Sequence, residues 1–216
     1  MSSLSKVLLI FAALLAGAYL FVPNLLAFPA QALLKTIPIW LLGWMAWREA
    51  PEKYRLALML ALVFSGIGDF ALASPFSLSF AVGMTAFFVA HLFYLWIFTR
   101  SLRQWKQLDV SRRTIIILIG LYAVLMGAIV LPKTGELMPA IAAYFLVLSL
   151  MAAASFAGLT ARWTRLGAVL FVLSDTLIGI DRFVVPLEFR HLAVMASYYA
   201  AQAFILAGIC WQKPRA

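Results

Sequence analysis

The sequence predicts an all-α membrane protein, a bundle of about eight transmembrane helices. Of its 216 residues, 65% are hydrophobic and 12% are charged, whereas soluble domains average about 45–50% apolar and about 25% charged residues. The apolar residues gather in stretches of about 20, the length that crosses the hydrocarbon core of a bilayer. Most lysines and arginines lie between these stretches. A soluble core of this size could not bury so much apolar surface, so lipid must cover the remainder.

Eight stretches qualify as spans, and together they form one polytopic domain over residues 1–216. They cover residues 6–26, 30–48, 55–73, 78–99, 113–131, 137–157, 165–184 and 190–211. The connections are short and contain no linker or soluble domain. Lys6, the apolar run after it and the small residues near Ala16 also fit a cleavable signal peptide. Cleavage of the first span therefore stays open as an alternative.

The placement of the cations predicts that both termini are cytoplasmic. Thirteen of the 17 lysines and arginines lie at the termini or in the connections between spans two and three, four and five, and six and seven. The opposite side holds Lys35, Lys133, Arg182 and Arg190. Such an excess marks the cytoplasmic side. It also accounts for the net charge of +9, so we expect no nucleic-acid partner.

Three of the eight acidic residues lie inside spans. A charge near the centre of a spanning helix costs about 2.5–3.5 kcal/mol, which makes such residues functional candidates. Asp69, in SGIGDFALA, and Asp175, in FVLSDTLIGIDRF, are the two deepest. The structural alternative is that each is paired, Asp69 with an arginine or a hydroxyl. Asp181 points to another face near the outer end, where we expect a structural or interfacial role.

Other polar residues fall at similar depths. His91 shares a helical face with Tyr94 and Phe87, although a lone intramembrane histidine can also be a satisfied core residue. In the last span, Tyr198 or Tyr199 shares a face with Gln202. The antiparallel path of the spans brings these groups toward the level of Asp69 and Asp175, so we expect them to converge on one cavity. His191, at the start of the last span, is expected to be interfacial.

Taken together, these elements resemble the YhhN family, which includes the lysoplasmalogenases of bacteria and animals. The resemblance rests on Gly68–Asp69, on Phe80, Gly83, Phe87, His91 and Tyr94, on LFVLSDTLIGIDRF at 170–183, and on YYAAQ at 198–202. It implies a membrane enzyme that cleaves the vinyl ether bond of lysoplasmalogens to a fatty aldehyde and a glycerophospho-ethanolamine or -choline. It implies no cofactor and no metal, and we expect the bacterial inner membrane as its location.

Vinyl ether hydrolysis needs a proton donor, a base for water and negative charge near a cation. We expect Asp175 to be the donor and Asp69 the base or cation stabiliser, with His91 and Tyr94 orienting water or a carboxylate. Arg182 would bind the substrate phosphate or pair with an aspartate. The remaining pocket residues would be Ser174, Tyr198, Tyr199 and Gln202.

Two other functions remain open on the sequence alone. A metal-dependent membrane hydrolase would need three or four ligands, whereas the chain has two histidines and one cysteine. A carrier or binding protein for an amphiphilic lipid would use the same polar pocket without chemistry.

Overall fold

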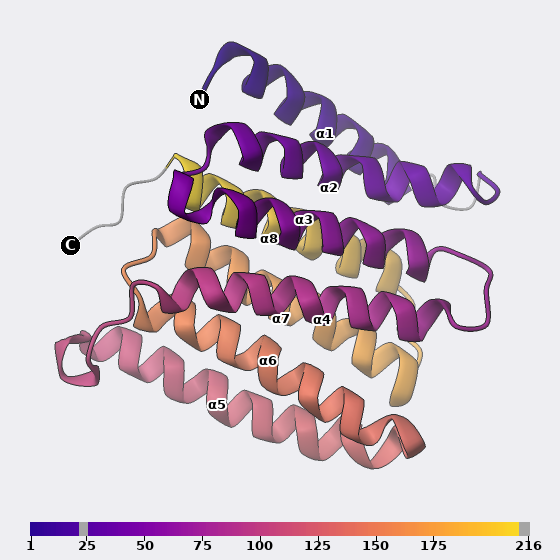
Figure 1. The fold of residues 1–216 in the computed structure, drawn as a ribbon. Helices are drawn as coiled ribbons and strands as arrows, with labels where there is room; N and C mark the ends of the chain where they lie inside the picture. Colours follow the sequence, from indigo (N-terminus) through magenta and orange to yellow (C-terminus); the bar gives the residue numbers. More distant parts are fainter. Residues whose placement is uncertain (22–25, 212–216) are drawn as a thin grey trace. The chain divides into compact units, whose positions relative to one another are not determined.

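The computed structural model describes residues 1–21 and 26–211, and within them the chain forms eight α-helices and no strand (Figure 1). An isolated bridge joins Leu102 to Gly158. The α-helices are α1 (Ser3–Phe21), α2 (Ala30–Glu49), α3 (Glu52–Leu72), α4 (Ser79–Thr99), α5 (Val110–Val130), α6 (Met138–Ala157), α7 (Arg162–Phe183) and α8 (Arg190–Cys210). Three 3-10 turns flank α5, namely η2 (Trp105–Gln107), η3 (Leu131–Lys133) and η4 (Gly135–Leu137).

Each α-helix corresponds to one predicted span, with ends that differ by a few residues. The last residues expected for the first span, 22–25, lie outside the described residues. So do Lys213 and Arg215, on which the expected orientation partly depends.

Six of the helices in the described ranges are long and apolar enough to cross a membrane, by length and composition alone. The two that fall short are α2 and α7. They are the helices that carry Lys35 and Asp175, together with further charged residues near their ends. The other helices expose large apolar side chains: on α5, Leu121 and Val124 are 61% and 73% exposed. Exposed apolar surfaces of this kind are typical of helices that face lipid or another protein.

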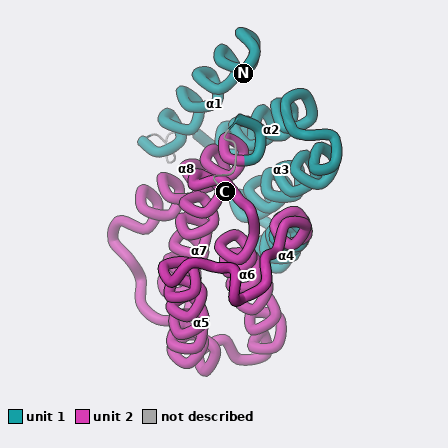
Figure 2. The backbone as a smooth tube through the Cα atoms, turned by 90° about the vertical axis from the view of Figure 1, so that its left-hand side faces the viewer, with its two compact units in different colours: residues 1–94, 209–211 teal, residues 95–208, 212–216 magenta. Residues whose placement is uncertain are grey.

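The chain divides into two compact units (Figure 2). Unit 1 comprises Met1–Tyr94 and Ile209–Trp211. In it α2 packs between α1 and α3. Glycines allow close crossings: a Cβ at Gly66 would collide with the Trp40 ring of α2, and one at Gly68 would lie 2.6 Å from the Phe87 ring of α4.

The described part of unit 2 is Leu95–Gly208. Here α5 and α6 run side by side, and α6 also packs on α7. Helices α7 and α8 cross closely, because a Cβ at Gly167 would lie 2.7 Å from the carbonyl oxygen of Ala201. At the start of α5 the Asp109 side chain accepts a hydrogen bond from the Arg112 amide at 2.8 Å and caps the helix.

One carboxylate in unit 1, Glu49 at the end of α2, joins three parts of the chain. It accepts hydrogen bonds from the Ser5 hydroxyl at 2.6 Å, the Ser2 amide at 3.0 Å and the Trp211 indole at 2.9 Å. These bonds, that of Ser5 first, lower the pKa of Glu49 from 4.5 to about 2. The ionised form is therefore favoured in the folded protein.

We expect the stability that Glu49 contributes to disappear in acid. Because the folded-state pKa lies below the ordinary value, that contribution is complete above about pH 5 and is lost as the pH falls toward about 2. Thermal unfolding in detergent should show a lower Tm for Glu49→Gln than for the wild type at pH 7, by about 2–4 °C for each kcal/mol lost. The difference in Tm between the two proteins should be smaller at pH 3. A gap that stays constant from pH 7 to pH 3 would contradict this account of Glu49.

Candidate functional site

Asp69, near the end of α3, forms a buried ion pair with a lysine. The Nζ of Lys35 lies 3.2 Å from Asp69 Oδ1, and the two side chains are 9% and 2% exposed. The first turns of α2 lie beside the last turns of α3 because the helices are antiparallel (Figure 1). The sequence raised the possibility of an arginine or hydroxyl partner for Asp69. The cation found beside it is a lysine.

The contact between α2 and α3 fixes this pair. The Thr36 hydroxyl lies 3.5 Å from the carbonyl oxygen of Gly66, and the Trp40 indole donates to the carbonyl of Val63 at 3.3 Å. The absent side chain at Gly66 makes room for the Trp40 ring. Side chains of the neighbouring helices α2 and α4 occupy the space beside Gly66 and Gly68 of α3.

His91 and Tyr94 lie in the part of α4 that belongs to unit 1, and both are fully buried. His91 Nδ1 donates to the carbonyl of Phe87, the residue one turn earlier. A carbonyl only accepts, so the proton sits on Nδ1, and in the neutral ring Nε2 is the acceptor nitrogen. The Phe87 ring packs against Gly68, the residue before Asp69. Helix α4 therefore docks on α3 at the level of the ion pair.

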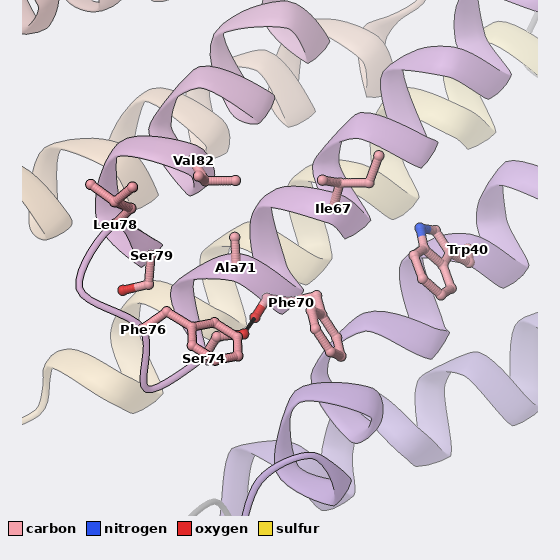
Figure 3. Close-up of a pocket in the computed structure, with 9 residues that line it drawn as sticks. All are labelled: Trp40, Ile67, Phe70, Ala71, Ser74, Phe76, Leu78, Ser79 and Val82. Atoms are coloured by element: carbon pink, nitrogen blue, oxygen red, sulfur yellow. Dashed lines mark hydrogen bonds between the residues drawn. The ribbon is translucent and has the colours of Figure 1, made fainter.

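An apolar groove of about 310 Å³ opens on unit 1 near the connection from α3 to α4 (Figure 3). Phe70 and Ile67 of α3 contribute to it, as do Leu78 and Val82 on the far side of the connection, and Trp40 of α2. Asp69 is not among the lining residues, so the groove and the ion pair occupy different faces of α3.

Asp175, in the middle of α7, belongs to unit 2 and has a different partner. The Tyr144 hydroxyl of α6 donates to Asp175 Oδ2 at 2.6 Å. Asp175 is 8% exposed. A phenol carries no charge at neutral pH, so the contact seen here differs in kind from that between Asp69 and Lys35.

The other expected residues of unit 2 lie along α7 and α8. Ser174 donates to the carbonyl of Val194 at 3.2 Å and so joins the two helices. Tyr198 packs edge-on against Phe171, with ring centroids 5.6 Å apart. Tyr199 and Gln202 are also buried. Ser174 therefore serves helix packing in this structure, while the tyrosines and Gln202 supply polar groups inside unit 2.

Asp181 and Arg182 lie at the end of α7. Asp181 Oδ2 is 2.9 Å from the Arg190 Nε, and its Oδ1 accepts from the Leu187 amide at 3.0 Å. These contacts hold the connection between α7 and α8 in place, so the role of Asp181 here is structural. Arg182 is exposed, with its guanidinium 5.8 Å from the centre of the Phe183 ring.

Two partners of the buried carboxylates, Lys35 and Tyr144, were missed by the sequence analysis as members of a site. Lys35 was counted as a cation that flanks a span, because it falls near the start of its helix. The free-energy cost of placing a charge inside a membrane helix applies to a lysine as well as to an aspartate. Tyr144 gave no signal, since one tyrosine in an apolar helix is ordinary.

Among residues 1–21 and 26–211, no cluster of three histidine, cysteine or acidic residues is placed to hold a metal.

Comparison with known proteins decides the family. The profile of the YhhN family matches residues 30–209, which includes almost all of α2 through α8. The chain belongs to the YhhN family. Its likeness to curated relatives is extensive. It is 38% identical to the lysoplasmalogenase TMEM86B of Homo sapiens, over 81% of this chain and 73% of that protein. It is 37% identical to the lysoplasmalogenase TMEM86B of Rattus norvegicus, over 81% of this chain and 71% of that protein.

This YhhN protein is also similar to bacterial relatives. It is 33% identical to the lysoplasmalogenase of Mycobacterium bovis, over 72% of this chain and 61% of that protein. No solved structure matches the chain significantly. The family and the exposed apolar helices together make this YhhN chain an integral membrane protein of all-helical structure.

Proposed function

We propose that this YhhN protein is a lysoplasmalogenase, which hydrolyses the vinyl ether bond of an alkenyl-glycerophosphoethanolamine or -choline. The observation that carries the proposal is its similarity to relatives named lysoplasmalogenase over about four-fifths of the chain. The products would be a fatty aldehyde and a glycerophospho-base. The substrate is itself a membrane amphiphile, which suits an enzyme embedded in lipid.

The reaction defines what the site has to provide. Protonation of the vinyl ether at the carbon beta to oxygen gives an oxocarbenium ion. Water adds to that ion and loses a proton to a base, and the hemiacetal collapses to aldehyde and alcohol. Two carboxyl groups can divide these tasks, as they do in glycosidases. No redox step occurs.

The local environments support a division of labour between the two aspartates. Asp69 lies beside the ammonium of Lys35, a setting that suits a carboxylate acting as base or cation stabiliser. Asp175 is buried beside the phenol of Tyr144, which adds no positive charge, and burial favours the protonated form of a carboxyl. Pairs of acids in contrasting environments are typical of acid–base catalysis. We therefore assign proton donation to Asp175.

The remaining residues take binding and orienting roles in this proposal. His91 would orient the attacking water through its acceptor nitrogen, and Tyr94 would support that position. Arg182, exposed at the end of α7, would bind the substrate phosphate. Tyr198, Tyr199 and Gln202 would contact the rest of the substrate, and Ser174 would hold α8 against α7 through its bond to the Val194 carbonyl.

We further propose that α1–α8 each cross the bacterial inner membrane, within one domain and with both termini in the cytoplasm. The excess of cations in alternate connections supports this orientation. Membrane lipids would surround the exposed apolar faces. Helices α2 and α7 would cross because Lys35 and Asp175 are buried inside the protein, while their other charged residues lie near the helix ends.

The decisive test is aldehyde release by purified wild-type protein in detergent. We expect stoichiometric release of fatty aldehyde from a lysoplasmalogen, no release from the corresponding alkyl-ether or ester lysolipid, and no loss of rate after treatment with EDTA. The alkyl ether has no double bond to protonate, so it is a matched control. Binding of the lysoplasmalogen without aldehyde release would favour a lipid carrier, and loss of rate with EDTA would favour a metal-dependent hydrolase.

A further inference from the structure

We infer that Lys35 is a positioning residue for the reaction: its ammonium holds the Asp69 carboxylate charged and correctly placed during vinyl ether cleavage. This inference rests on the proposed function. It concerns unit 1 alone, where Lys35 Nζ lies 3.2 Å from Asp69 Oδ1.

The ion pair between Lys35 and Asp69 is buried, which distinguishes it from an ion pair on the protein surface. Both side chains are almost completely removed from the surface of the protein. Exposed ion pairs contribute little to folding, and a buried pair is often no more stabilising than apolar residues of the same volume. In a membrane helix, ionisable residues that pair with one another mark functional sites. Stability alone therefore gives no reason for a lysine and an aspartate at this depth.

Several contacts besides the ion pair hold α2 on α3. Trp40 donates to the carbonyl of Val63, and its ring fits against Gly66. Thr36 lies next to Lys35 and faces the carbonyl of Gly66. These contacts set the register that brings Lys35 opposite Asp69. Lys35 adds the positive charge, whereas the packing of the two helices depends on its neighbours.

Helix α2 also contains a proline close to the ion pair. Pro38 lies inside the helix, three residues after Lys35. Proline has no amide hydrogen to donate, so the carbonyl of Leu34 loses its usual helical partner. The carbonyl without an amide partner therefore belongs to the residue before Lys35, and in membrane helices neighbouring groups satisfy such carbonyls.

The charge of Lys35 matters for the role given to Asp69. A base and cation stabiliser must be ionised, and an isolated carboxylate in an apolar interior is strongly disfavoured. A neighbouring ammonium offsets that penalty and leaves a carboxylate available for water or for the oxocarbenium ion. Lys35 touches Asp69 and not the reacting atoms, so its effect should appear in kcat more than in KM.

The test compares Lys35→Arg with Lys35→Gln in the purified full-length protein. Both replacements can donate a hydrogen bond to Asp69, but only arginine carries a charge. We expect Lys35→Gln to lower kcat by about 10²-fold with KM within about threefold of the wild type. Lys35→Arg should recover most of that loss. Size-exclusion profiles and Tm values establish that the variants are folded.

Several results would overturn the inference. Equal kcat values for the two variants would remove the role of charge. A raised KM with unchanged kcat in Lys35→Gln would make Lys35 a phosphate-binding residue. If Lys35→Gln does not fold, Lys35→Arg decides alone: a kcat within about tenfold of the wild type supports the role of the charge, and a loss of about 10²-fold in folded Lys35→Arg refutes it. An inactive wild-type protein would instead refute the proposed function, and the assignment of Lys35 with it.

Discussion

Replacing Asp175 with asparagine is expected to lower the rate of aldehyde release by about 10²–10⁴-fold, the usual contribution of a general acid. Asparagine keeps the shape of the side chain and can still accept the hydrogen bond that Tyr144 donates at 2.6 Å. It has no carboxyl proton to give to the vinyl ether. The loss should therefore appear in kcat, measured with saturating lysoplasmalogen, while the Tm changes little.

Asp181→Asn is the matched control for this experiment. Asp181 lies on the same helix, but its contacts are with Arg190 and the Leu187 amide in the connection to α8. We expect Asp181→Asn to stay within a few-fold of the wild-type rate and to lose some thermal stability. A folded Asp175→Asn protein with a wild-type rate would remove Asp175 from the mechanism.

Replacing Gly68 with leucine is expected to prevent the folding of unit 1. Even a single Cβ at this position would lie 2.6 Å from the Phe87 ring and 3.2 Å from the carbonyl oxygen of Gly83. The ring can turn, but the carbonyl belongs to the backbone of α4 and cannot move away cheaply. Overpacking of this kind costs about 1–3 kcal/mol for small additions, so Gly68→Ala should lower the Tm measurably. The branched leucine should yield aggregated protein.

Gly120→Ala provides the contrast. Gly120 also lies inside a long helix, α5, but a Cβ there would meet no atom within 4 Å. Alanine is a better helix former than glycine, so this change should leave the Tm equal or slightly raised. Equal losses for Gly68→Ala and Gly120→Ala in the same detergent would show that the close crossing of α3 and α4 does not limit stability.

The sequence was sufficient to predict the helices because the bilayer sets a simple rule of length and apolarity. Each of the eight predicted spans overlaps one observed α-helix. Asp69 and Asp175 were found for a similar reason, since a carboxylate in an apolar helix is costly and therefore conspicuous. Both are buried in the structure. These predictions needed no knowledge of which helices are neighbours.

The partners of the two carboxylates could not be predicted because they depend on helix packing. A lysine near a helix end usually extends its flexible chain toward the interface, which made Lys35 resemble a flanking cation. In the structure the contact of Trp40 with Gly66 fixes α2 against α3, and Lys35 lies opposite Asp69. Tyr144 meets Asp175 only because α6 packs on α7.

The exposure of α5 has a consequence for the lipid around the protein. Its 21 residues extend about 31 Å at about 1.5 Å per residue, close to the hydrocarbon thickness of about 30 Å. More than half of its residues are exposed, so lipid tails would cover much of its surface in a bilayer. A thinner bilayer would force such a helix to tilt or would deform around it. The length of the lipid acyl chains should therefore affect the tilt of α5. The detergent chosen for purification should affect it in the same way.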